Sequence, residues 1–182
     1  MYIQSTFIHL DKLGVHKEKE LWNKNILSWK DYQENIEKTN LFFEDKDSKL
    51  YPSINALKEK NVDYFSNKIK KNEYYRLAIS FPEDVLFLDI ETTGLSQYYD
   101  HITMIGWSIN NHYDYYINGI TDITNFINAV KRAKIIVTFN GSIFDIPFIK
   151  KFFSQISFPL CHIDLRFFSK RFNLSGGQKV IE

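Results

Sequence analysis

Residues 85–95 read VLFLDIETTGL. The stretch begins with a short apolar run that contains one acid near its end, and Thr-Thr-Gly follows at residues 92–94. A run of this length and composition predicts a buried central strand over residues 85–90. Asp89 lies inside that strand, where a carboxylate is costly to desolvate without a partner. Asp89 and Glu91 are two residues apart, so on a strand both side chains project from the same face. The stretch therefore predicts a sheet strand with a pair of neighbouring acids.

These two acids admit two interpretations. Carboxylates side by side repel each other unless a cation lies between them, and hard oxygen ligands select Mg²⁺ or Mn²⁺. The Thr-Thr-Gly turn that follows would open space beside the acids. The alternative is an aspartate at a strand end and an exposed glutamate at a turn. The spacing alone favours neither.

A third acid follows a second apolar strand. Residues 138–147 read TFNGSIFDIP, after the apolar run at 135–139 and before a helix whose first turn would include Pro147. Asp145 therefore arrives at a strand–helix junction, where ligands gather in α/β sheets. Taken alone, Asp145 is better explained as the cap of that helix.

The chain divides near residue 80, because six of its seven glycines lie at Gly94 or later. From residue 81 onward the sequence predicts an α/β domain in which three antiparallel strands, two of them joined by an Asn110-Asn111-His112 turn, precede strand–helix units. This order is typical of a mixed sheet with helices on its faces. The expected strands are residues 85–90, 103–109, 113–117, 135–139 and 160–163, and the expected helices are 121–133, 147–153 and 164–172, with another helix starting at Gln178.

Residues 1–80 read as a helical N-terminal region. Ser28 offers an N-cap with an acid three positions on, at Asp31, for a helix to about residue 38. Leu13-Gly14-Val15 is similar to the turn of a degenerate helix–hairpin–helix, in which backbone N–H groups bind a phosphate. A plain pair of helices is the favoured alternative. Residues 44–49 (EDKDSK) are expected to form a polar link.

The amino-acid composition is typical of a globular protein and does not indicate a particular binding partner. Apolar residues make up 44% and charged residues 25% of the 182 residues, and the net charge is +1, so no bulk charge indicates nucleic acid. No run of about 18 apolar residues occurs, which predicts that the protein has no membrane partner. The single Cys161 and the absence of a visible signal peptide favour a cytoplasmic location.

Together, D-x-E-T-T-G-L at residues 89–95 and F-N-G-x-x-F-D-x-P-F at residues 139–148 resemble the DEDD superfamily of 3′–5′ exonucleases on the ribonuclease H-like fold. Within that superfamily the sequence is most similar to the YprB-type ribonuclease H-like domain. The resemblance covers nearly the whole chain, because further similar segments lie at residues 6–10, 20–22, 26–31, 162–165, 171 and 174–182.

The resemblance implies two-metal hydrolysis of phosphodiester bonds at single-stranded 3′ ends, with DNA favoured over RNA. Asp89 and Glu91 would hold two Mg²⁺ or Mn²⁺ ions, Asp89 bridging them, and Asp145 would bind the second ion directly or through water. Such ions stabilise the attacking and leaving oxygens and lower the pKa of the attacking water. A non-catalytic nucleic-acid-binding module on the same fold is the alternative, and a structural domain with capping acids only is a further one.

The resemblance also implies a substrate-binding set. Thr92, Thr93 and Gly94 would offer backbone N–H groups near the terminal nucleotide, and Leu95 would wedge against its base. Asn140 would position the loop of the second motif, and Asp164 is interpreted as a substrate-side or structural residue.

The sequence departs from the superfamily at its last motif, a His or Tyr four residues before a final Asp. No Asp among the 182 residues has a His or Tyr at that spacing, and His162 lies only two positions before Asp164. We therefore expect the domain at residues 81–182 to be incomplete at its C-terminus. This chain is expected to bind metal weakly and to hydrolyse little on its own.

Overall fold

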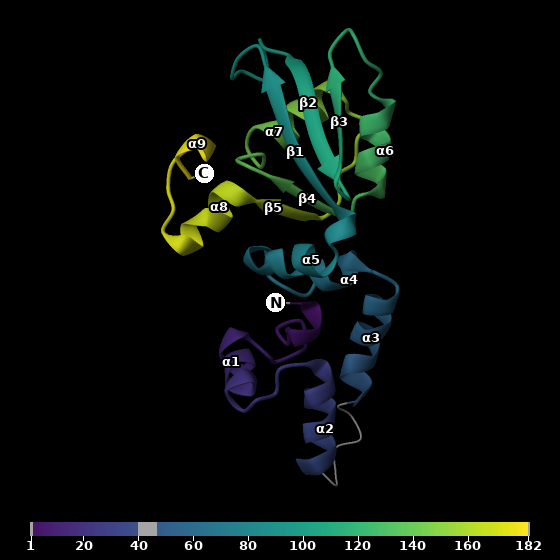
Figure 1. Ribbon diagram of the computed structural model, residues 1–182, viewed down its shortest axis with the longest axis vertical. Helices are drawn as coiled ribbons and strands as arrows, with labels where there is room; N and C mark the ends of the chain where they lie inside the picture. Colours follow the sequence, from purple (N-terminus) through teal and green to yellow (C-terminus); the bar gives the residue numbers. More distant parts are fainter. Residues whose placement is uncertain (1, 40–46, 182) are drawn as a thin grey trace. The chain divides into compact units, whose positions relative to one another are not determined.

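The computed structural model describes residues 2–39 and 47–181 (Figure 1). The chain divides into two compact units, Met1–Phe81 and Pro82–Glu182. Each unit is built around its own buried side chains and is described separately below. Among the described residues, no helix combines the length and the apolar character that crossing a bilayer requires.

The second unit contains a five-stranded mixed sheet in the order β3-β2-β1-β4-β5. The pairs β1–β2 and β2–β3 are antiparallel, whereas β1–β4 and β4–β5 are parallel. This arrangement confirms the predicted α/β class with a mixed sheet. The strands are β1 (Val85–Thr92), β2 (Ile102–Ile109), β3 (His112–Ile117), β4 (Ile135–Thr138) and β5 (Cys161–Asp164).

Helices flank this sheet (Figure 1). Alternate residues of β1, such as Leu86, Leu88 and Ile90, join one core with Phe126 and Phe148, which come from the two longest helices of this unit. The side chains between them on β1 point to the opposite face. The helical elements are η3 (Pro82–Asp84), α6 (Thr124–Arg132), α7 (Asp145–Phe152), α8 (Leu165–Ser169), η4 (Lys170–Phe172) and α9 (Gln178–Ile181).

The turn between β2 and β3 is one residue shorter than predicted. Asn110 and Asn111 have φ values of 50° and 59°, and His112 already pairs with Ile109 as the first residue of β3. Two consecutive residues with positive φ match the twist of a tight hairpin, and asparagine tolerates that conformation better than most residues.

The described residues of the first unit form helices and turns. Its elements are η1 (Ile3–Ser5), α1 (Val15–Asn23), α2 (Trp29–Thr39), α3 (Asp47–Lys58), α4 (Val62–Ser66), η2 (Lys71–Glu73) and α5 (Tyr75–Ser80). The predicted cap of α2 is confirmed, because Asp31 Oδ2 accepts the Ser28 N–H at 2.8 Å while the Ser28 hydroxyl accepts the Asp31 N–H at 3.2 Å.

Two other expectations for this unit meet the structure only in part. Residues 44–46 of the polar link lie outside the described residues, and its remaining residues begin α3. Gly14 is the residue before α1, and turns rather than a helix precede it. The helix–hairpin–helix interpretation of Leu13-Gly14-Val15 stays a prediction.

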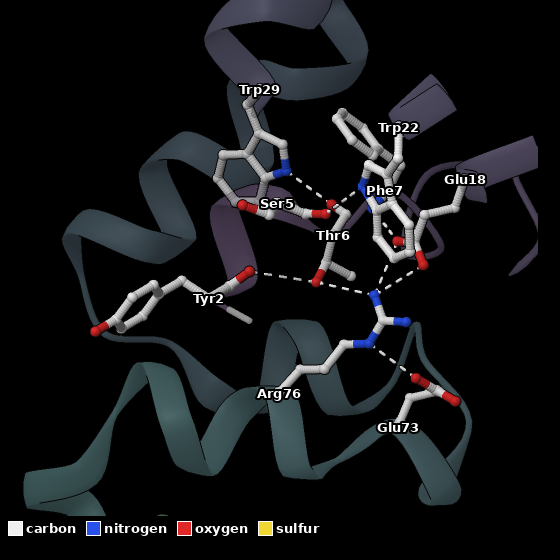
Figure 2. A network of polar contacts seen from close by, with 9 residues as sticks. All are labelled: Tyr2, Ser5, Thr6, Phe7, Glu18, Trp22, Trp29, Glu73 and Arg76. Carbon is white, nitrogen blue, oxygen red and sulfur yellow. Dashed lines mark hydrogen bonds and ion pairs between the residues drawn. The ribbon is translucent and has the colours of Figure 1, made fainter. Parts of the chain in front are cut away.

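A buried ion-pair network holds the first unit together (Figure 2). Arg76, on α5, is 4% exposed and lies 2.8 Å from Glu18 of α1 and 2.8 Å from Glu73 of η2. The guanidinium also donates to the Thr6 hydroxyl at 3.2 Å, and Glu18 accepts the Phe7 N–H at 2.7 Å. One cation therefore ties three helical elements to the N-terminal segment.

Removing that cation should destabilise the first unit strongly. Arg76→Ala leaves the Glu18 and Glu73 carboxylates buried without their partner, and we expect a loss of about 3–5 kcal/mol of unfolding free energy. Urea titration followed by the fluorescence of Trp22 and Trp29 measures it. Lys30→Ala is the matched control, because its 3.9 Å pair with Glu34 is solvent-exposed and should change stability by less than about 1 kcal/mol. Equal losses for both variants would contradict the assignment.

Candidate functional site

The two acids of β1 lie on the face of the sheet that α6 and α7 leave uncovered. Burial alternates along the strand, so that Leu88 and Ile90 face the core while Asp89 and Glu91 face the other way. On β2, the partner of Asp89 is Gly106, which has no side chain. The Asp89 carboxylate therefore has open space on the β2 side.

The electrostatics agree with two neighbouring acids in a partly buried position. Partial burial raises the pKa of Asp89 above its ordinary value, and the negative charge of Glu91 raises it further, whereas the Ile90 N–H opposes the shift. The prediction that these two side chains share a face and repel each other is consistent with this shift.

Asp145 reaches the same strand from α7. Its side chain is 2% exposed, and its Oδ1 accepts the Ile90 N–H at 3.1 Å. The pairing of β1 with β4 ends at Phe87 and Val137, so the Ile90 N–H needs an acceptor other than β4. The alternative that Asp145 caps the helix is wrong, because Phe144 is the N-cap and Asp145 bonds to another strand.

The Asp145 carboxyl is held in an environment that disfavours its charge. Burial raises its pKa to about 7, and the charges of Asp89 and Asp164 add to the shift, while the N–H groups of Asp145 and Ile90 oppose it. The carboxylates of Asp89 on β1 and Asp164 at the end of β5 therefore both act on Asp145 of α7. The sequence spacing could not show this convergence, because 56 residues separate Asp89 from Asp145.

The chemistry of these donors fits a hard divalent cation, whose charge would favour the ionised form of both aspartates against the burial and the like charge that raise their pKa values. Within residues 2–39 and 47–181, however, no three His, Cys, Asp or Glu side chains come close enough to hold a metal ion. Asp89 and Glu91 thus present a carboxylate pair, while Asp145 is engaged by the backbone of β1. Metal binding by all three stays a prediction.

The loop after β1 is braced by Asp100. Thr93 donates its hydroxyl proton to Asp100 Oδ1 at 3.2 Å, and the Ser96 N–H donates to Asp100 Oδ2 at 2.9 Å. A Cβ on Gly94 would lie 2.6 Å from the Asp100 carboxylate, so a larger residue there would displace the carboxylate from these hydrogen bonds. The loop leaves the Leu95 side chain 85% exposed, and the Thr92 hydroxyl donates to the Gly94 carbonyl at 2.6 Å.

The second loop is held by Asp164. Its two carboxylate oxygens accept the N–H groups of Asn140 at 2.8 Å and of Ser142 at 3.0 Å, and Oδ1 also accepts the Arg166 N–H at 3.1 Å. Asn140 has a φ of 64°. Three backbone donors account for the buried Asp164 carboxylate structurally, and a contact between Asp164 and substrate stays a prediction.

A hollow of about 280 Å³ lies on the open face beside Asp89. Phe87, Gly106, Phe139 and Leu165 are among the residues that line it. The site is therefore an acidic edge next to an apolar depression on the same sheet.

The family model of the RNase H superfamily matches residues 86–182, which is more than half of the chain. The chain belongs to the RNase H superfamily. Membership confirms the predicted ribonuclease H-like fold of the second unit. The narrower YprB-type assignment stays a prediction.

Solved structures also match this RNase H-like chain. The family B DNA polymerase from the hyperthermophilic archaeon Pyrobaculum calidifontis matches with a TM-score of 0.33 and 24% identity, over 42% of this chain and 11% of the polymerase. The Nibbler EXO domain of Aedes aegypti matches with a TM-score of 0.40 and 10% identity, over 57% of this chain and 53% of that domain's chain. No curated protein matches the sequence significantly. This chain thus spans about a tenth of the polymerase and about half of the Nibbler chain.

Sequence reasoning missed Arg166. Its guanidinium Nη1 donates to Asn140 Oδ1 at 2.6 Å, so a basic side chain lies directly on the second loop. The sequence offered one indication of a role for Arg166: it lies two residues after Asp164, at the start of an expected helix. The partner lies 26 residues away, which no local pattern indicates.

The pKa of Asp145 predicts how stability depends on pH in the absence of divalent ions. A pKa near 7 in the folded state, above the ordinary 3.8, means that the folded protein binds more protons than the unfolded chain. Stability should therefore fall as pH rises from about 4 to 7 and then level off, by about 1.4 kcal/mol for each unit of pKa difference. Melting temperatures in EDTA across this range measure the fall.

Asp145→Asn should flatten that dependence, because the amide stays neutral and its Oδ1 can still accept the Ile90 N–H. Asp122→Asn is the control, since Asp122 is exposed and its pKa is lowered by hydrogen bonds from Thr124. A profile that falls equally steeply in Asp145→Asn would show that another group causes it.

Proposed function

We propose that this chain is part of a metal-dependent 3′–5′ exonuclease that hydrolyses phosphodiester bonds at single-stranded nucleic-acid ends, with DNA as the favoured substrate. The observation that supports the proposal is the Asp89–Glu91 pair on the open face of β1 of an RNase H-like sheet, with Asp145 bonded to the N–H of Ile90, the residue between them. Burial, and after it the charge of neighbouring carboxylates, raises the pKa values of Asp89 and Asp145, and acids perturbed in this way are common at functional sites.

In this proposal each acid has a distinct position. Asp89 and Glu91 would hold Mg²⁺ or Mn²⁺ on the open face of β1, and Asp145 would complete the ligand set from α7. A bound divalent ion supplies a water of lowered pKa and stabilises charge on the phosphoryl oxygens. Thr92, Thr93 and Gly94 would contact the terminal nucleotide through their backbone, and exposed Leu95 would contact its base.

A second candidate function is a non-catalytic nucleic-acid-binding module. It is favoured by one observation: the described residues bring no three metal-ligating side chains together. Under this candidate the acids would maintain the fold of the sheet edge, and binding to nucleic acid would not respond to divalent ions.

The test is a cleavage assay on a 5′-labelled single-stranded DNA and its RNA counterpart. With Mn²⁺, the protein should shorten the DNA stepwise from its 3′ end. Asp89→Asn should slow cleavage by on the order of 100- to 1,000-fold, the loss typical of one electrostatic group at a reacting centre. The 182-residue chain alone should cleave slowly, since it has no His or Tyr four residues before an Asp.

Asp114→Asn is the matched control, because Asp114 is a strand carboxylate that bonds to Tyr115 and Asn125 on β3 and α6 rather than to the site. Shortening from the 5′ end would contradict the proposed polarity. Binding without any cleavage that depends on both Mn²⁺ and Asp89 would favour the non-catalytic module.

A further inference from the structure

A second hollow, of about 540 Å³, lies against the Asn140 loop. Its walls come from α8, η4 and the segment at residues 174–177. The charged side chains that line it are Arg166 and Lys170, and its polar side chains are those of Asn140, Ser169 and Ser175. The lining is therefore basic and neutral, which suits an anionic ligand.

Arg166 is held in place at this hollow. Its backbone N–H donates to Asp164 Oδ1 at 3.1 Å, and its Nη1 donates to Asn140 Oδ1 at 2.6 Å. Asp164 in turn accepts the Asn140 N–H, so loop and arginine are bound to the same carboxylate. A guanidinium fixed in this way loses less conformational entropy when it binds, and its remaining N–H groups form a planar fork that matches phosphate oxygens.

The basic hollow adjoins the acids. Phe139 lines both the hollow beside Asp89 and the hollow beside Arg166. Asp164, which positions Arg166, is close enough to Asp145 to raise its pKa. Phe139 is therefore common to a hollow that Asp89 lines and a hollow that Arg166 and Lys170 line.

This separation of charge fits a phosphodiester chain rather than a single anion. The acids alone would repel a nucleic-acid backbone, so a substrate that reaches them needs a cationic contact nearby. Lys170, whose Nζ lies 5.3 Å from the centre of the Phe167 ring, adds a second positive charge to the same hollow.

We propose that this hollow binds a backbone phosphate of the single-stranded substrate next to the one that is cleaved. Arg166 contacts the phosphate, and Asn140 is the positioning residue that orients the guanidinium. The inference rests on the proposed function for the identity of the ligand, but it concerns binding and can be measured without hydrolysis.

The experiment is a fluorescence-anisotropy titration of a labelled single-stranded DNA in EDTA, at several KCl concentrations, with the 182-residue chain. Arg166→Ala should weaken binding about tenfold at low salt, a loss of about 1.4 kcal/mol. It should also make the slope of log K against log salt shallower by about 0.7, the value for one phosphate contact on a single strand. Arg166→Lys should keep the slope but lose part of the affinity, because an ammonium lacks the fork.

Asn140→Gly tests the positioning of Arg166 separately from its charge, because the arginine itself is kept. Glycine accepts the positive φ of residue 140 without strain but removes the Oδ1 that holds Arg166, so we expect weaker binding with an unchanged slope. Arg132→Ala is the matched control, because it removes an exposed arginine at the end of α6 that does not line the hollow. Melting temperatures of all variants show whether each remains folded.

Folded Arg166→Ala protein that binds with wild-type affinity and slope would overturn the inference. Inorganic phosphate at constant ionic strength should reduce the difference between wild type and Arg166→Ala, because it offers the same oxygens to the guanidinium, and a difference that is unchanged by phosphate would overturn the inference too. Loss of binding in Arg166→Ala, in a protein that never cleaves, would leave this inference standing while the exonuclease proposal fails. If cleavage depends on Asp89 while Arg166→Ala binds as wild type does, the exonuclease proposal stands and this inference fails.

Discussion

The hydrogen bond from the Ile90 N–H to the Asp145 carboxylate determines how the second unit is organised at its functional edge. β4 leaves β1 after Phe87, and the carboxylate takes the position that the next strand residue would occupy. The bond therefore fixes the start of α7 against β1 at the point where Asp89 projects to the other side. Burying an acid here satisfies a backbone donor, and it also brings like charges together.

Around the two hollows, charges of opposite sign are separated, although the net charge of the chain is close to zero. A net charge of +1 over 182 residues suggested no ionic partner. In the structure, acids lie on β1 and α7, whereas Arg166 and Lys170 line the hollow at the Asn140 loop. Local separation of charge, rather than the total, is what a phosphodiester ligand would meet.

The sheet could be predicted from the sequence because its signals are local. Apolar runs marked the strands, and an Asn-Asn pair marked the hairpin, although the turn has two residues rather than three. The Ser28–Asp31 cap was found for the same reason, since both partners lie within one helical turn. The alternation of burial on β1 followed from the period of a strand.

The site could be predicted only as a list of acids. Asp145 was better explained as a helix cap by its neighbours, because its true partner lies 55 residues away on β1. Arg166 was overlooked for the corresponding reason, as its contact with Asn140 exists only once β5 and the loop are side by side. Hydrogen bonds between residues so far apart in the chain produce no local or periodic pattern in the sequence.

Gly106 adds a consequence for how this scaffold can vary. A Cβ at this position would meet nothing within 4 Å, and the backbone does not require glycine there. The sheet therefore has room for a Cβ opposite Asp89, and a side chain there would enter the space beside the carboxylate. Access to the acids and the charge of the acids are thus independent properties of the chain, and a single substitution on a neighbouring strand can close the site while every ionisable group remains in place.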